Sequence, residues 1–148
     1  KDRVDDALHA TKAAIEEGII PGGGTALLYA SSGLEVKSTG AAIVVEACAK
    51  PFNQILVNAG HDSVKAQIIA DGLVNSENDG WLGYDIKTDN TVDMKEAGII
   101  DPTKVARTAL ENAASVAGTV LLTECTVVNE PNDDNNQPQI DPSMMGMM

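Results

Sequence analysis

The chain has 148 residues, enough for one ordinary domain, and its 22 acidic against 10 basic side chains leave a formal charge of −12. This charge argues against nucleic-acid binding, because phosphate backbones are held by clustered Lys and Arg, and it argues against docking on anionic membranes. Aromatic residues make up only 3% of the sequence, so Ala, Val, Ile and Leu must build the core, and no apolar run is long enough for a membrane-spanning helix.

The chain begins with the pattern of an amphipathic helix over residues 2–17. Apolar side chains recur there at steps of three and four residues. Acidic residues stand in the first turn, where the helix dipole favours negative charge. Gly18 is expected to end this helix, and a second short helix is predicted over 25–31.

Three consecutive glycines, Gly22, Gly23 and Gly24, separate these two helices. Glycine permits positive φ and close approach of another group to the main chain. The run is therefore typical of a tightly packed helix–helix turn, or of a place where backbone N–H groups meet a phosphate or a sugar. The glycines alone leave both interpretations open.

The middle of the chain predicts further helices and one hairpin. Residues 40–59 have helical periodicity, and Pro51 within them predicts a kink or two abutting helices. A short capped helix is expected over 62–70. Residues 80–86 have the pattern of a short strand or hairpin arm, and 93–97 predict one helical turn.

The last predicted helix begins with Asp101 as its N-cap and Pro102 at its first position, and it runs to about Thr123. Small residues line one face of this helix, so another helix can approach it closely. Residues 125–129 have the pattern of an edge strand. Residues 131–148 are polar and end in methionines, and such sequence predicts a disordered tail.

Three carboxylates are the candidate chemical groups. Asp5 and Asp6 stand at a helix start, where they either compensate the dipole or, for one of them, orient a water molecule or a metal. Asp101 either caps its helix or accepts hydrogen bonds from ribose hydroxyls. The positions of His9 and His61 do not predict a zinc site, and no protein metal site is expected.

Five segments together resemble the C-terminal part of the group I chaperonins, the GroEL type. They follow one another in order and cover nearly the whole chain. The segments are RVDDALHAT (3–11), EEGIIPGGG (16–24), GIIDPTKV (98–105), AASVAG (113–118) and TEC (123–125).

The resemblance implies a mainly α fold: a multi-helical bundle like the chaperonin equatorial domain, with a small β hairpin or edge strand and a disordered Met-rich tail. It implies that residues 1–18 end the intermediate domain, that 19–130 form the C-terminal half of the equatorial ATP-binding domain, and that 131–148 form a flexible tail.

The resemblance also implies nucleotide-binding residues. Gly23 corresponds to a backbone contact with the nucleoside, and Asp101 corresponds to the carboxylate that holds the ribose. Asp85, Ile86 and Lys87 occupy the loop beside the adenine.

By the same resemblance, Asp6 corresponds to the catalytic aspartate that positions the attacking water for ATP hydrolysis. ATP and Mg²⁺ are the implied cofactors. The family's phosphate-binding Gly-Asp-Gly-Thr-Thr loop is absent from these residues. The 148-residue chain alone is therefore expected to be inactive, because other residues must bear the phosphate charge and the metal.

The implied assembly is a homo-oligomeric ring, as two stacked seven-membered rings, with a GroES-type co-chaperonin lid and unfolded polypeptides as substrates. The implied location is the bacterial cytoplasm, with an organelle matrix as the alternative. A non-catalytic helical scaffold or oligomerisation module is the alternative function. A stand-alone small-molecule enzyme is disfavoured, because no nucleophile, base and orienting group recur together.

Overall fold

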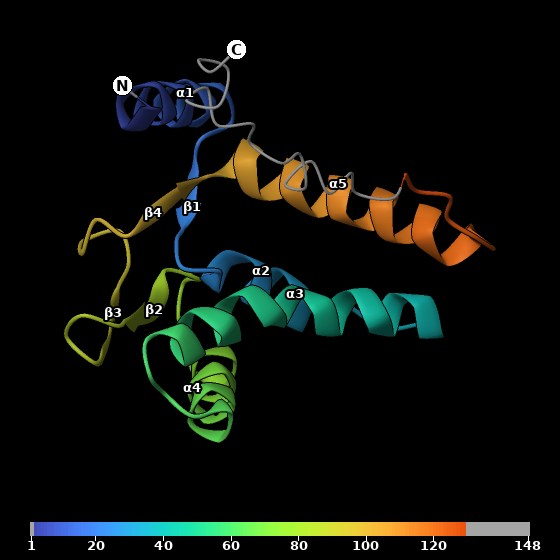
Figure 1. Ribbon diagram of the computed structural model, residues 1–148. Coiled ribbons are helices and arrows are strands. Elements are labelled where there is room, and N and C mark those ends of the chain that lie inside the picture. Colours follow the sequence, from blue (N-terminus) through green and yellow to red (C-terminus); the bar gives the residue numbers. More distant parts are fainter. Residues whose placement is uncertain (1, 130–148) are drawn as a thin grey trace, which may run out of the picture.

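The computed structural model describes residues 2–129, and within them the chain forms five helices and four short strands (Figure 1). The helices are α1 (Asp2–Glu17), α2 (Thr25–Ser32), α3 (Thr39–Asn58), α4 (Ser63–Asn75) and α5 (Thr103–Leu122). The strands are β1 (Ile19–Pro21), β2 (Leu82–Asp85), β3 (Asn90–Asp93) and β4 (Ile100–Pro102). The predicted mainly α fold is confirmed, whereas the predicted tail lies outside the described residues.

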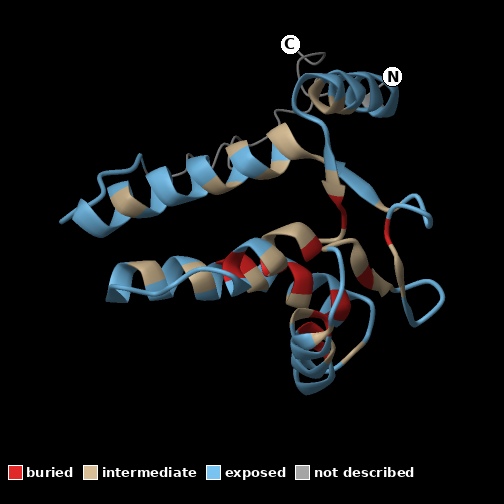
Figure 2. Ribbon diagram, turned by 180° about the vertical axis from the view of Figure 1, so that it is seen from behind, coloured by how far each residue is buried: buried red, intermediate tan, exposed pale blue. Residues whose placement is uncertain are grey.

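Helices α2, α3 and α4 pack into one helical body with the β2–β3 hairpin beside it. Most of the buried residues lie in this part of the molecule (Figure 2). Its hydrophobic core consists of Leu28, Phe52, Leu56, Ala66, Ala70 and Leu73. The hydroxyl of Tyr29 donates to the carbonyl of Leu82 at 2.8 Å, and this bond ties α2 to the hairpin.

Helices α1 and α5 form a second unit, joined to the body by the antiparallel β1–β4 ladder. In Figure 1 the two helices lie on one side of the ladder and α2–α4 on the other. Ile20 pairs with Asp101 at the centre of the ladder. At its end the Thr103 N–H donates to the Gly18 carbonyl at 3.1 Å.

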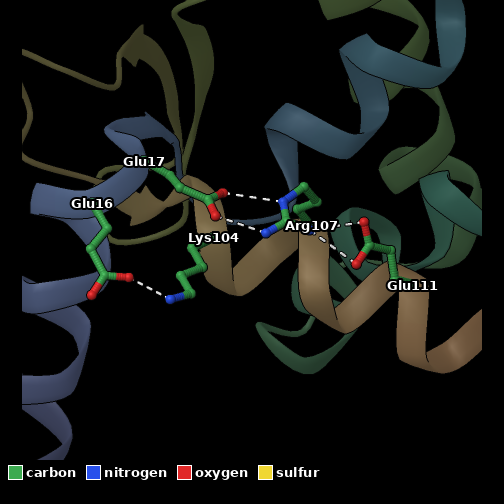
Figure 3. Close-up of polar contacts among 5 residues, drawn as sticks. All are labelled: Glu16, Glu17, Lys104, Arg107 and Glu111. Carbon is green, nitrogen blue, oxygen red and sulfur yellow. Dashed lines mark hydrogen bonds and ion pairs between the residues drawn. The ribbon is translucent and has the colours of Figure 1, made fainter.

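Ion pairs hold the C-terminal end of α1 against the first turns of α5 (Figure 3). Lys104 pairs with Glu16. Arg107 donates from Nη2 to Glu17 at 2.7 Å and from Nη1 to Glu111 at 2.9 Å. Because both basic side chains hold α1 through neighbouring glutamates, the junction at Gly18 is clamped from the α5 side.

The prediction that Asp101 caps the last helix is wrong. Asp101 lies in β4, Pro102 occupies the N-cap position, and no side chain caps α5. Pairing of β4 with β1 holds these residues in an extended conformation. The first N–H of the helix is satisfied by the Gly18 carbonyl, so a side-chain cap is not required there.

The helix predicted over 40–59 corresponds to α3, which continues through Pro51 to Asn58. Of the two alternatives at Pro51, two abutting helices are therefore excluded, and the kink stays a prediction. The strand predicted at the end of the described residues is wrong. Residues 125–129 are exposed and form no strand, because no strand edge pairs with them among the described residues. The predicted short helix after Asp62 is confirmed, with Asp62 accepting from the Lys65 N–H at 2.7 Å, and it extends five residues beyond Ala70, to Asn75.

Within residues 2–129, apolar side chains of α1 and α5 remain exposed. Val4, Leu8 and Ile15 of α1 are 73%, 66% and 81% exposed, and no residue of α5 is buried. The amphipathic pattern was therefore correct about the helices but does not mark a core formed within these residues. Among residues 2–129, no helix combines the length and apolarity needed to cross a bilayer.

Candidate functional site

A cavity of about 400 Å³ lies between the glycine turn, α3, the β2–β3 hairpin and the segment before β4. Gly23 contributes backbone to it, and Phe52, Ile55 and Leu56 line it from α3. The hairpin contributes residues 84–87, and residues 97–100 complete the wall. Segments separated by more than seventy residues in sequence therefore meet around one largely apolar space.

Packing accounts for two of the three consecutive glycines. The Gly22 N–H donates to the Ile99 carbonyl at 2.9 Å, and a Cβ on Gly22 would lie 3.1 Å from that oxygen. Gly24 has a φ of +78°, and a Cβ there would lie 2.7 Å from the Phe52 nitrogen. These two glycines form a tightly packed turn, as one of the two interpretations of the run predicted.

The middle glycine is the one that faces the cavity. Gly23 has a φ of +65°, and a Cβ on it would lie 3.7 Å from Met94 Cε, which is an ordinary contact. Its requirement for glycine is therefore conformational rather than steric. Gly22 and Gly24 hold the main chain of Gly23 in place at the edge of the cavity.

Met94 is a buried residue that contacts several of the segments around the cavity. Its side chain is 0% exposed and lies against Gly23 and Gly83. Its backbone N–H donates to the Trp81 carbonyl at 2.9 Å, and its carbonyl accepts from the Ile99 N–H at 2.8 Å. Met94 thus connects three sides of the cavity: the hairpin, the glycine turn and the segment before β4.

Asp85 begins the turn of the hairpin that faces the cavity. Its carboxylate accepts from the Lys87 N–H at 2.9 Å and from the Thr88 hydroxyl at 2.9 Å. These hydrogen bonds, the Lys87 N–H first, hold the pKa of the Asp85 carboxyl below its usual value. The carboxylate is therefore used to shape its own turn, while Ile86 and Lys87 present side chains at the cavity.

Asp101 lies beside this cavity rather than in it. It lines a smaller neighbouring cavity of about 190 Å³ together with Ala10, Ala14 and Pro102. Ile100 lines both cavities and separates them. Within residues 2–129 the Asp101 carboxylate makes no hydrogen bond or ion pair, so its acceptor oxygens remain available.

Asp6 is exposed on α1 and lines neither cavity. Ala10 follows it by four residues, so the two share one side of the helix, about 6 Å apart along its axis. Because Ala10 borders the same small cavity as Asp101, Asp6 lies one helical turn beyond that cavity. The structure thus brings Gly23, Asp85, Ile86 and Lys87 together, sets Asp101 beside them and leaves Asp6 apart.

Much of the apolar lining of the cavity could not be predicted from the sequence. Ile55 and Leu56 have the same periodicity as core residues, so their pattern carries no signal for a cavity. Tyr84 packs against the core and also lines the cavity. The motif around Ile99 was the one available signal on that side of the cavity.

Within residues 2–129 no group of three or more His, Cys, Asp and Glu side chains is arranged to hold a metal ion. The described residues therefore do not offer a complete set of metal ligands by themselves.

Comparison with known proteins identifies the family of the chain. Residues 1–131 match the model of the TCP-1/cpn60 chaperonin family. The chain belongs to this family. It is also similar to a solved group III chaperonin in the open state, with 30% sequence identity and a TM-score of 0.67. That match covers 78% of this chain and 25% of the other, so this chaperonin chain spans a quarter of its relative's length.

The predicted chaperonin family is therefore confirmed. The finer prediction, membership of group I, stays a prediction, because the solved relative is a group III protein.

Proposed function

We propose that these residues form one wall of the nucleotide site of an ATP-dependent chaperonin that assists protein folding. The observation that supports this most directly is the 400 Å³ cavity, which gathers Gly23 with Asp85, Ile86 and Lys87. Its volume lies within the range of small-molecule sites, roughly 300–1,000 Å³, and such sites are mostly apolar with a few polar groups.

In this proposal the cavity takes the base of the nucleoside. Ile86 and Ile99 offer apolar surface to a flat ring, and backbone groups of the hairpin turn offer hydrogen bonds. The carboxylate of Asp85 contributes indirectly, because it holds the turn in shape. Beyond Ile100, the unpartnered carboxylate of Asp101 accepts hydrogen bonds from the ribose hydroxyls.

Asp6 is the proposed catalytic residue. Its carboxylate orients the attacking water and accepts its proton as the general base. Mg²⁺, when bound with ATP, would neutralise phosphate charge. Because α1 joins the rest of the chain at Gly18, which has a φ of +81°, a swing of α1 about that residue would bring Asp6 to the nucleotide and gate hydrolysis. This swing requires the ion pairs of Glu16 and Glu17 with Lys104 and Arg107 to open.

The same proposal includes the assembly. We infer a homo-oligomer of the group I type, with two stacked seven-membered rings, a GroES-type lid and unfolded polypeptides as substrates, in the bacterial cytoplasm or an organelle matrix. The uncovered apolar faces of α1 and α5 support assembly with further protein, since exposed faces of this kind mark contact surfaces.

The test uses the natural polypeptide that carries these residues, with Asp6→Ala, Asp101→Ala and Asp5→Ala. Asp5 is a matched control, because adjacent side chains on a helix diverge by about 100°. Asp6→Ala should leave ATP affinity within about twofold and slow turnover by about 10²–10⁴. Asp101→Ala should weaken ATP binding about tenfold, and Asp5→Ala should change neither quantity.

A wild-type protein that binds no ATP in calorimetry would overturn the proposal, as would normal turnover in Asp6→Ala. A helical scaffold is the second candidate, and the absence of buried residues along α5 favours it. A scaffold would still self-associate in sedimentation measurements but would not bind ATP.

A further inference from the structure

A second cluster of polar side chains lies on the side of the hairpin away from Asp101, and it centres on Asp89. Within residues 2–129, Asp89 is the only residue other than glycine with a positive φ, at 55°. The left-handed conformation is unfavourable for a residue with a Cβ, although Asp tolerates it better than most. Such a conformation persists where surrounding contacts over-determine it.

The Asp89 carboxylate has three partners from separate parts of the chain. The Tyr84 hydroxyl donates to Oδ1 at 2.6 Å, and Nε2 of His61 lies 3.1 Å from the same oxygen. Nζ of Lys65 lies 3.6 Å from Oδ2. The rings of His61 and Tyr84 also meet edge to face, with centroids 5.9 Å apart.

The Asp89 carboxylate is held in its charged form, which favours these three contacts. The Tyr84 hydroxyl first, and then the charge of Lys65, hold the pKa of Asp89 below its usual value, so the group is an ionised acceptor at neutral pH. The side chain of His61 is 14% exposed and that of Asp89 is 59% exposed, so the contact is covered on the His61 side and open to water at the carboxylate.

These contacts join two elements that line the cavity. Tyr84 lines the cavity from the hairpin and begins the run to Lys87. The backbone N–H of His61 donates to the carbonyl of Leu56 at 3.1 Å, and Leu56 lines the cavity from α3. The chain of contacts from Leu56 through His61 and Asp89 to Tyr84 therefore connects α3 with the hairpin beside the cavity.

We propose that His61, Asp89 and Tyr84 form a clasp that holds the β2–β3 hairpin against the end of α3 and so sets the width of the cavity. The three are positioning residues for the nucleoside, and this role rests on the proposed function. Opening the clasp lets the hairpin move away from α3. The loop at Asp85–Lys87 then occupies its binding arrangement for a smaller fraction of the time, and the apparent affinity falls by that fraction.

Three substitutions test the clasp. Asp89→Gly removes the carboxylate but keeps the positive φ without strain, so it isolates the contacts from the backbone conformation. Asp89→Asn is the conservative variant, because it keeps an acceptor oxygen and tolerates the same φ. Tyr84→Phe removes only the hydroxyl, and Glu77→Gln is the control, an exposed residue that precedes the hairpin and lies outside the clasp.

Two measurements are made on each variant. The first is hydrogen exchange of the amides of residues 82–93 in the 148-residue chain. The second is ATP affinity of the natural polypeptide that carries these residues. Asp89→Gly should speed hairpin exchange about tenfold and weaken ATP binding by a similar factor, while Asp89→Asn should restore both to within about threefold of wild type. Tyr84→Phe should act in the same direction as Asp89→Gly, and Glu77→Gln should change neither measurement.

Unchanged exchange and unchanged affinity in both Asp89→Gly and Tyr84→Phe would overturn the clasp. If the wild-type protein binds no ATP, the proposed function fails, and the exchange measurement alone then decides the clasp. Faster exchange in Asp89→Gly, reversed in Asp89→Asn, would support it as a structural device. Equal rates of hairpin exchange in Asp89→Gly and Asp89→Asn would refute the clasp.

Discussion

Replacement of Gly24 by Ala is the sharpest test of how the glycine turn is built. At a φ of +78°, an alanine pays the left-handed backbone penalty of about 1–2 kcal/mol. Its Cβ would also lie 2.7 Å from the Phe52 nitrogen and 3.0 Å from the Phe52 Cα, so backbone must shift. Forced overpacking of this kind costs about 1–3 kcal/mol. The two costs together predict that Gly24→Ala lowers the free energy of unfolding by about 2–5 kcal/mol.

Two other glycines separate these costs. Gly18 has a similar φ of +81° with nothing within 4 Å of its Cβ position. Gly18→Ala should therefore lower the free energy of unfolding only by the penalty for the left-handed backbone, about 1–2 kcal/mol. Gly72 lies inside α4 with open space around it, and Gly72→Ala should stabilise the chain by about 0.5–1 kcal/mol.

Urea unfolding followed by circular dichroism compares the three variants with the parent chain. If Gly24→Ala leaves too little folded protein for an unfolding midpoint to be measured, the loss of its far-ultraviolet circular dichroism signal at zero urea still shows that it is the least stable of the three variants. Equal losses in Gly24→Ala and Gly18→Ala would refute the reasoning, because crowding against Phe52 would then contribute nothing.

Two further predictions concern the supports of the site. Glu17→Gln should speed hydrogen exchange in the last turn of α1 at pH 7, because it weakens the contact with Arg107. The hydrogen bond from Arg107 lowers the pKa of Glu17, so the stability that this contact contributes is present above the ordinary pKa of 4.5 and is lost as pH falls through the lower pKa of the folded state. The exchange rates of the variant and the wild type should therefore converge in acid. A difference in exchange that persists in acid would contradict a role for the Glu17–Arg107 contact. Met94→Ala should lower the free energy of unfolding by about 2–5 kcal/mol, since Met94 is fully buried, whereas Val127→Ala, at a residue 93% exposed, should stay within about 0.5 kcal/mol in the same urea assay.

Local signals in the sequence predicted most of the helices well. The periodicity of residues 2–17 and the stop at Gly18 correspond to α1, whose last turn is closed by a Gly18 N–H to Ala14 carbonyl bond of 2.8 Å. Asp62 caps α4 as expected. These features depend on residues within one or two turns of one another, so a window of sequence contains the information that specifies them.

The β1–β4 ladder was not predicted, and this omission explains the error at Asp101. Each strand has only three residues, and the two lie about eighty residues apart, so neither segment has a recognisable strand pattern. The rule that Asp before Pro begins a helix was applied locally, but pairing with Ile20 held Asp101 in a strand. The same pairing leaves its carboxylate free beside the cavity.

Likewise, the clasp could not have been found from the sequence. His61 and Asp89 are 28 positions apart and belong to no motif, and His61 was considered only as a poor metal ligand. Their contact depends on how the hairpin turns back onto the end of α3.

The sequence by itself determined which segments form helices, where α1 ends and α4 begins, and which family the chain resembles, because each of these depends on neighbouring residues or on ordered motifs. Only the tertiary structure decided that Gly23 and residues 85–87 share one cavity, that Asp101 stands beside it and Asp6 apart, and that the contacts of Asp89 connect α3 with the hairpin. These relations are contacts between distant segments, and they follow from the packing of whole elements rather than from any local preference of the chain.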